Sequence, residues 1–148
     1  MCGNCCSGPE GEIPVLAQDR RRLAKHVGLS IRSFNEHYTT ISKNTKSRIL
    51  KMNPTPGKKE SLDCIFLDRE KIPGKAICSA HSAKPKQCQT WPFWPSILEN
   101  EKSWKATGKH CCGIDDGELV HSQKEIEKKM RIMKGPEKKF GAFERGWK

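Results

Sequence analysis

Cys2-Gly3-Asn4-Cys5-Cys6, at the start of the chain, is the stretch that decides how this protein folds. Two cysteines separated by two residues can direct both thiolates at one metal ion from a single turn. A third cysteine follows directly and five more lie downstream, which is not typical of thiols that only fill space in a core. We therefore predict a metal site with these candidate ligands: Cys2, Cys5, Cys6, Cys64, Cys78, Cys88, Cys111 and Cys112.

The spacing of the later cysteines does not match a simple zinc site. A second C-x-x-C pair, which closes the usual four-thiolate pattern, is absent from the sequence. Adjacent side chains tend to diverge in an extended chain, so we expect Cys5 and Cys6 to serve different metals or different corners of one cluster. Eight thiols allow two four-thiolate sites, one polynuclear cluster, or one site with spare thiols. Their number favours a polynuclear site, and thiols alone do not distinguish zinc from an iron–sulfur cluster.

The composition indicates a single small domain with a thin apolar core. The chain has 148 residues, the length of one ordinary domain, and about 18% of them are Leu, Ile, Val or Phe. The 28 Lys and Arg residues outnumber the 17 Asp and Glu residues and leave a net charge of +11. Disordered chains share this low apolar content and high charge, but they rarely carry eight cysteines and four tryptophans. A bound metal is the element that could hold such a domain together.

Several classes of protein are excluded by what the sequence lacks. No window approaches the 18 apolar residues of a transmembrane helix, so we expect no membrane partner. The apolar stretch Ile13–Ala17 is too short for the core of a signal peptide, and we therefore expect a cytoplasmic protein with reduced thiols. A disulfide framework is then the weaker interpretation of the cysteines. The glycine motifs of Rossmann and P-loop nucleotide sites are absent as well.

Local patterns predict short helices and strands in the first half of the chain. The spacing of apolar residues predicts helices over residues 19–27 and 31–38, with Ser30 capping the second. We expect the inward faces of these helices to carry Leu23, Ala24, Val27, Ile31, Phe34 and Tyr38. Short strands are predicted over residues 12–16 and 48–52, with a solvated loop over residues 53–60.

The second half of the chain predicts a hairpin followed by helices. Residues 65–67 and 76–77 are expected to pair around the turn at Pro73-Gly74. Residues 91–95 are expected to form an ordered irregular turn, because two prolines flank Phe93-Trp94. Helices are predicted over residues 98–107 and 122–133, the first docked through Trp104 and the second amphipathic through Ile126, Met130 and Met133.

These elements together predict an α+β fold: a small, irregular, cysteine-rich domain stabilised by metal, with short strands and several short helices. We place the cysteine-cluster domain at residues 1–119, followed by a basic amphipathic helix and tail over residues 120–148.

Five spaced motifs resemble the YkgJ-type cysteine-cluster proteins, a family of zinc- or iron-chelating domains with a CxxCxxCC signature. The resemblance covers roughly residues 1–119 and rests on the following segments: Cys2-Gly3-Asn4-Cys5-Cys6, Asp63-Cys64-Ile65-Phe66-Leu67, Cys78 to Cys88 with Lys84-Pro85, Trp91-Pro92-Phe93-Trp94-Pro95, and Cys111-Cys112-Gly113-Ile114. Cys112 stands where the family motif has proline, so the resemblance implies Cys111 rather than Cys112 as the ligand of that pair. It also implies a metal site without a settled reaction, although one branch of the family is named flagellin N-methylase.

Three functions remain open on the sequence alone. The first is a metal-binding protein whose zinc or iron–sulfur centre has a structural or redox role. The second is a protein-modifying, methylase-like enzyme, for which no separate catalytic constellation is evident. The third is a nucleic-acid-binding module that uses the basic residues, but ionisation of all eight thiols would lower the net charge to +3, and no nucleic-acid-binding motif is present. We expect His81 and His110, which lie near cysteines, to orient thiolates rather than to bind the metal.

Overall fold

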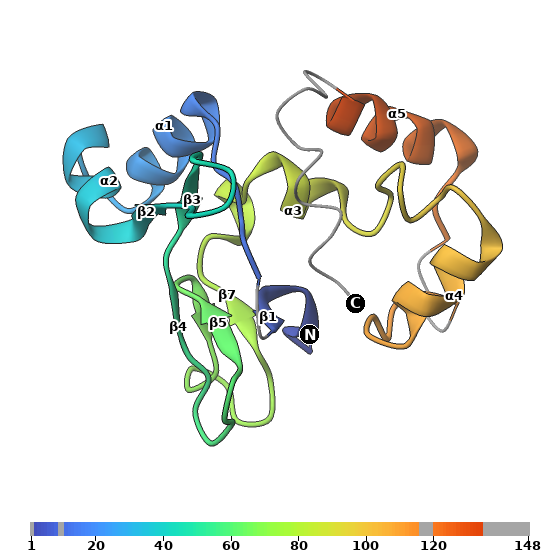
Figure 1. The fold of residues 1–148 in the computed structure, drawn as a ribbon, viewed down its shortest axis with the longest axis horizontal. Coiled ribbons are helices and arrows are strands. Elements are labelled where there is room, and N and C mark those ends of the chain that lie inside the picture. Colours follow the sequence, from blue (N-terminus) through green and yellow to red (C-terminus); the bar gives the residue numbers. More distant parts are fainter. Residues whose placement is uncertain (1, 9–10, 116–119, 135–148) are drawn as a thin grey trace. The chain divides into compact units, whose positions relative to one another are not determined.

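The computed structural model describes residues 2–8, 11–115 and 120–134, and it confirms a small α+β fold (Figure 1). Most of the described short antiparallel strands follow one another between helix α2 (Ile31–Tyr38) and the helices of the second half of the chain. By its internal packing the chain divides into two compact units, residues 1–85 and residues 86–148, and each is described by itself. None of the described helices is both long and apolar enough to cross a membrane.

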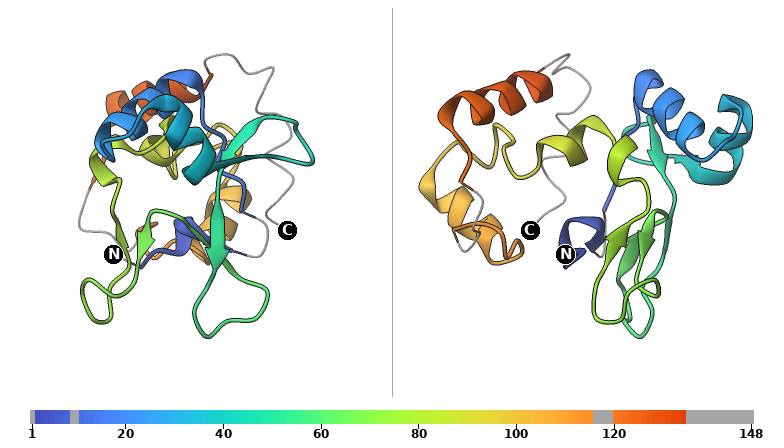
Figure 2. Two further views of the ribbon diagram at one scale, coloured as in Figure 1. Left: turned by 90° about the vertical axis from the view of Figure 1, so that its left-hand side faces the viewer. Right: turned by 180° about the vertical axis from the view of Figure 1, so that it is seen from behind.

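Residues 1–85 contain the strands. Figures 1 and 2 show the α1–α2 pair at one end of this unit and the loops of the β4–β5 and β6–β7 hairpins at the other. The elements in chain order are η1 (Asn4–Cys6), β1 (Ser7–Gly8), α1 (Ala17–His26), α2 (Ile31–Tyr38), β2 (Thr39–Ile41), β3 (Arg48–Leu50), β4 (Met52–Pro54), β5 (Leu62–Cys64), β6 (Leu67–Asp68), β7 (Ile77–Cys78) and η2 (His81–Ala83).

The strands form three small antiparallel sheets. β5 is the central strand of the largest one, with β1 on one side and β4 on the other. Asp63 of β5 therefore lies opposite Ser7 of β1 as well as opposite Asn53 of β4. β2 pairs with β3, and in the β6–β7 hairpin Leu67 lies opposite Cys78. Strands this short are marginal alone, so their register depends on side-chain contacts between the segments.

The core of this unit lies where α1 and α2 pack against the strands. Phe34, Leu23 and Leu50 are almost completely buried. The ring of Phe34 stacks on Tyr38 with centroids 5.2 Å apart, and Tyr38 stacks on Phe66 at the same distance. These three aromatic rings connect helix α2 to the turn that follows β5, and they supply much of the apolar contact in a domain with few large side chains.

The helix predictions for this unit were close, and the strand predictions were less so. α2 and its Ser30 cap are confirmed, with the Ser30 hydroxyl accepting from the Ser33 amide at 3.1 Å. α1 begins at Ala17, two residues before the predicted start, because the Asp19 carboxylate accepts from the Leu16 amide (3.1 Å) and caps the extra turn. The inward placement of Ile31 was wrong: it occupies the exposed start of α2 and is 43% exposed.

Three strand predictions need correction. Residues 12–16 do not form a strand, since only Pro14 bridges to Ile49 in an otherwise irregular segment. The predicted loop over 53–60 begins instead with β4, because Asn53 pairs with Asp63. The hairpin after β5 is confirmed, but its strands are β6 and β7, displaced by one or two residues from the prediction because residues 65–66 turn the chain.

Residues 86–148 are helical where they are described, with α3 (Lys86–Thr90), α4 (Glu101–Gly108) and α5 (Gln123–Lys134). α5 packs against α3, and the Phe93 side chain is buried against Trp104, His121 and the ammonium of Lys129, which lies 5.0 Å above its ring.

The irregular turn over 91–95 and the docking role of Trp104 are thereby confirmed. α4 begins at Glu101 rather than at residue 98, since Asn100 caps it by accepting from the Ser103 amide at 2.8 Å. Most of the predicted basic tail lies outside the described residues.

The buried aromatic stack generates the first prediction. Phe34→Ala should lower the free energy of unfolding by about 3–5 kcal/mol, because it removes a fully buried ring that touches two others. Ile31→Ala, in the same helix but exposed, should change it by only about 0.5 kcal/mol. Urea denaturation of both variants measures the difference, and equal effects would contradict this assignment of the core.

Candidate metal centre

The first cysteines are presented by a tight turn. Gly3 is buried, has a left-handed φ of 73° and precedes one turn of 3-10 helix, η1. The turn is closed by the amide of Cys6, which donates to the Gly3 carbonyl (2.9 Å), and by the hydroxyl of Ser7, which donates to the same oxygen (3.0 Å). As a result the Sγ atoms of Cys5 and Cys6 lie only 3.7 Å apart.

This short distance corrects the expectation that the two adjacent thiols diverge. The backbone here is helical rather than extended, and a helical turn brings neighbouring side chains closer than a strand does. Two thiolates bound to one zinc ion at about 2.3 Å with tetrahedral angles lie about 3.8 Å from each other. The Cys5–Cys6 pair therefore already has the sulfur separation that two ligands of a single metal ion require.

Two further thiols of this unit lie near the pair. Cys64, at the end of β5, is only 6% exposed, and Cys78, at the end of β7, is half-buried. Both interact electrostatically with Cys5 and with each other. The register explains part of this convergence: continuing the β1–β5 pairing by one residue brings Cys6 opposite Cys64.

Cys5, Cys64 and Cys78 differ in how readily they ionise. The pKa of Cys5 is lowered to about 6, chiefly by a hydrogen bond from the Cys6 thiol, with help from its own backbone amide and the charge of Lys84. Burial raises the pKa of Cys64 to about 12, and the negative charges expected at Cys78 and Cys5 raise it further. Burial also raises the pKa of Cys78. A group of thiols of this kind can bind a cation, because a positive charge between them stabilises each thiolate.

Lys84 is the nearest basic group to this cluster, and helix α1 holds the segment that carries it. Its ammonium acts on Cys5 and Cys78 and donates to Nε2 of His81 at 3.2 Å. From α1, Arg22 donates to the Lys84 carbonyl (3.1 Å) and Nε2 of His26 donates to the Ser79 carbonyl (2.8 Å). The segment from Cys78 to Lys84 is thus anchored at two carbonyls by a regular helix.

The remaining predicted ligands are Cys2 in the same unit and three cysteines in the other unit. Cys2 is exposed in the coil before Gly3. Cys88 lies on α3, while Cys111 and Cys112 follow α4, where Cys111 is half-buried and Cys112 exposed. His110 is exposed beside them. All eight cysteines belong to the described residues, and none of them forms a disulfide.

The thiols near Cys5 are gathered but not closed into a metal shell. Within the described part of the chain, no three Cys, His, Asp or Glu side chains converge closely enough to hold a metal ion together. The thiol donors and the Cys5–Cys6 separation fit a thiophilic metal, and the side chains of Cys64 and Cys78 would have to move toward this pair to complete a shell.

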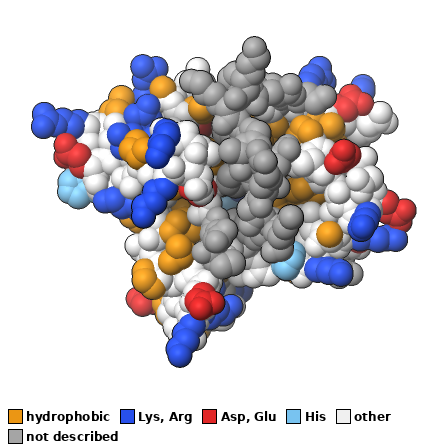
Figure 3. All heavy atoms as spheres, viewed as in Figure 1, with side chains coloured by type: hydrophobic (Ala, Val, Ile, Leu, Met, Phe, Trp, Pro, Cys, Tyr) orange, Lys and Arg blue, Asp and Glu red, His pale blue; other side chains and the backbone are white. Residues whose placement is uncertain are grey.

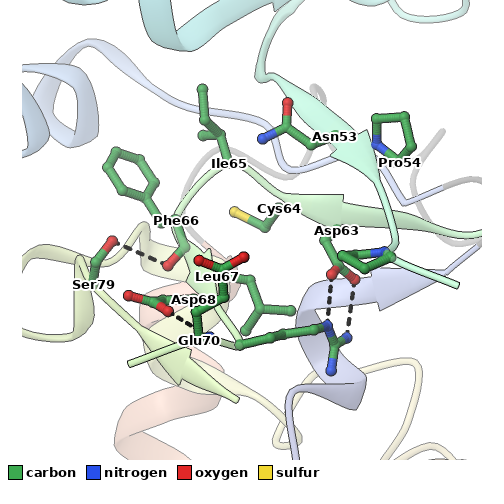
Figure 4. Close-up of a pocket in the computed structure, with 12 residues that line it drawn as sticks. Asn53, Pro54, Asp63, Cys64, Ile65, Phe66, Leu67, Asp68, Glu70 and Ser79 are labelled. Atoms are coloured by element: carbon green, nitrogen blue, oxygen red, sulfur yellow. Dashed lines mark hydrogen bonds and ion pairs between the residues drawn. The ribbon is translucent and has the colours of Figure 1, made fainter. Parts of the chain in front are cut away.

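A cavity of about 410 Å³ opens beside this site (Figure 4). Cys64 and Asp63 lie next to each other along β5 at its wall, and dashed lines mark the contacts of the Asp63 carboxylate with the guanidinium of Arg69. The acidic side chains of Asp68 and Glu70 line it as well. The cavity gives a solvated path to the otherwise buried Cys64 thiol.

Sequence reasoning missed Asp63 and Arg69 as residues of this site. Asp63 adjoins a cysteine, which is a weak signal, and Arg69 is one of many basic residues. Only the chain reversal after β5 brings the two together, so the pattern of the sequence alone did not indicate the pair.

Comparison with known families agrees with the chemistry of these thiols. Residues 1–113 match the family model CxxCxxCC, whose description is "Putative zinc- or iron-chelating domain". No solved structure matches the chain.

The turn at Gly3 generates a second prediction. A Cβ on Gly3 would lie 2.6 Å from the Cβ of Ala76, whereas a Cβ on Gly74, which has the same left-handed φ of 74°, would meet nothing within 4 Å. Both alanine variants carry backbone strain of about 1 kcal/mol, and Gly3→Ala should lose about 1–3 kcal/mol more through overpacking. Equal unfolding free energies for the two variants would show that the N-terminal turn is not packed on the β6–β7 hairpin.

Proposed function

Because the chain belongs to the CxxCxxCC family of zinc- or iron-chelating domains, we propose that it binds zinc or iron through thiolates and that the bound metal holds residues 1–119 together. Cys5, Cys6, Cys64 and Cys78 form the centre of the proposed site. Cys2, Cys88 and Cys111 are its further candidate ligands, and Cys112 is the thiol that the proposal leaves out.

The observation that carries this proposal is the 3.7 Å separation of the Cys5 and Cys6 sulfur atoms. Two thiolates at this separation repel each other, and a shared cation offsets that repulsion for both. Cys64 and Cys78 interact electrostatically with Cys5 of that pair, so the proposed donors come from three separate segments: η1, the end of β5 and the end of β7. A metal bound there would act as a cross-link between residues about seventy positions apart.

The charges around the thiols suit such a centre. Four thiolates and one divalent cation leave two negative charges, which need nearby positive groups in a partly buried site. Lys84 acts on Cys5 and Cys78, and the guanidinium of Arg69 acts on Cys6. When bound, zinc would supply a closed structural site, and an iron–sulfur centre would add the capacity to exchange one electron.

Metal content is the direct measurement of this proposal. After anaerobic purification, we expect stoichiometric zinc without sulfide, or iron with acid-labile sulfide and a visible absorption band. Cys6→Ser and Cys64→Ser should each lose most of this metal. The serine hydroxyl is close in size to the cysteine thiol, but it binds zinc and iron much more weakly than a thiolate does. Cys112→Ser is the matched control and should retain it, while Cys111→Ser should lose it. A folded wild-type protein without metal would refute the proposal.

Metal removal should also unfold the domain. Structural metal ions contribute on the order of 10 kcal/mol, which equals the whole net stability of an ordinary domain. The core of residues 1–85 is built from few large side chains, so it has little stability to spare. We expect the chelated protein to lose its cooperative thermal transition when followed by circular dichroism. An unchanged transition would mean that the metal has no structural role.

A further inference from the structure

The Asp63 carboxylate is the most heavily bonded polar group near the thiols. Its side chain is only 7% exposed, and it lies on β5 directly before Cys64. Nε of Arg69 donates to Oδ2 at 2.7 Å and Nη2 of Arg69 donates to Oδ1 at 3.0 Å, which makes a two-point fork. The Thr55 hydroxyl donates to Oδ1 as well, at 2.9 Å. These bonds lower the pKa of Asp63 to about 2, with Arg69 as the largest cause.

Arg69 extends this network to the N-terminal turn. Its Nη2 also donates to the hydroxyl of Ser7 at 2.8 Å, across 62 positions of sequence. The Ser7 hydroxyl in turn donates a hydrogen bond to the Gly3 carbonyl at 3.0 Å, and this oxygen closes the turn that carries Cys5 and Cys6. One guanidinium therefore touches the residue after Cys6 and the residue before Cys64.

We infer that Arg69 is a positioning residue of the thiolate site: it fixes the Cys5–Cys6 turn against the end of β5, so that thiols from both segments face one ion. This inference rests on the proposed metal site. β1 and β5 are short strands with little hydrogen bonding of their own, and β1 comprises only Ser7 and Gly8. Arg69 binds Asp63 of β5 at two points and Ser7 of β1 at a third, and this fixes β1 against β5 more firmly than two residues of strand pairing can.

A purely stabilising ion pair would look different. Arg32 and Glu36 form such a pair on α2, where both side chains are largely exposed and the two partners lie one helical turn apart. Pairs of that kind contribute little and hold nothing else in place. The Asp63–Arg69 pair is instead mostly buried and has a third partner, Ser7, on a distant segment. Its contacts end at the immediate neighbours of two proposed ligands.

Cobalt(II) titration of the metal-free chain, which is expected to refold as it binds the metal, tests the inference. Thiolate-bound cobalt absorbs in the near ultraviolet and visible range, so the spectrum reports ligand number and geometry as well as affinity. Arg69→Gln should weaken cobalt binding about 10- to 100-fold and shift the visible bands, as loss of an orienting partner does at metal sites. Arg69→Lys should weaken cobalt binding in the same way, because an ammonium keeps the positive charge but cannot bind the Asp63 carboxylate at two points. Arg32→Gln is the control and should match the wild type.

Ser7→Ala keeps the test decisive if Arg69→Gln fails to fold. It leaves the Asp63–Arg69 pair intact and removes both bonds of the Ser7 hydroxyl, the one it accepts from Arg69 and the one it donates to the Gly3 carbonyl. We therefore expect a folded protein with weaker cobalt binding and altered bands. Wild-type affinity and spectrum in both variants, or in Ser7→Ala when the other does not fold, would overturn the positioning role. A wild-type chain that binds no cobalt through thiolates would instead refute the metal site itself.

Discussion

The antiparallel pairing of Ser7–Gly8 with Leu62–Asp63 is the constraint on which the candidate site depends. It joins the N-terminal turn to the middle of the chain, and the same register brings Cys6 opposite Cys64. A two-residue strand contributes few hydrogen bonds, so the pairing relies on what surrounds it. Three features support the pairing. The turn at Gly3 is closed by hydrogen bonds, Gly3 packs closely against Ala76, and the Arg69 guanidinium binds both the Asp63 carboxylate and the Ser7 hydroxyl.

The α-helices of residues 1–85 support this arrangement and carry none of its cysteines. α1 holds the Cys78–Lys84 segment through two of its carbonyls, and α2 contributes Phe34 and Tyr38 to the aromatic stack that reaches Phe66. The stack ends two residues after Cys64. The apolar core and the thiol cluster are therefore adjacent parts of one packed region, and the loss of either is expected to weaken the other.

The basic character of the chain has a local role at the site and a general one elsewhere. Lys84 and Arg69 act directly on the thiols, where positive charge stabilises thiolates. Many other basic side chains are exposed, and Figure 3 shows a group of them over the region of α1 and α2. Exposed basic residues of this kind keep a small domain soluble and attract anions without base-specific contacts. The excess positive charge is thus divided between the proposed metal site and the surface.

The sequence by itself determined the class of protein and its longer elements. The number and spacing of the cysteines indicated a chelating domain, a family that residues 1–113 match. Helical periodicity located α1, α2 and α5, because each spans two or more turns and repeats its apolar face. α3, with five residues, is too short to show that repeat, and the strands of two or three residues show no alternation.

Only the tertiary structure decided which residues meet. The approach of Cys5 to Cys6 depends on a left-handed glycine and a 3-10 turn, whereas an extended backbone had been expected to make the two thiols diverge. The contacts of Arg69 with Asp63 and Ser7 depend on the chain reversal after β5 and on a pairing that spans more than fifty residues. Local conformational preferences act over a few residues. A site assembled from distant segments depends instead on the closure of long loops, whose entropy cost is offset by tertiary packing. No short-range sequence pattern specifies which distant segments pack together.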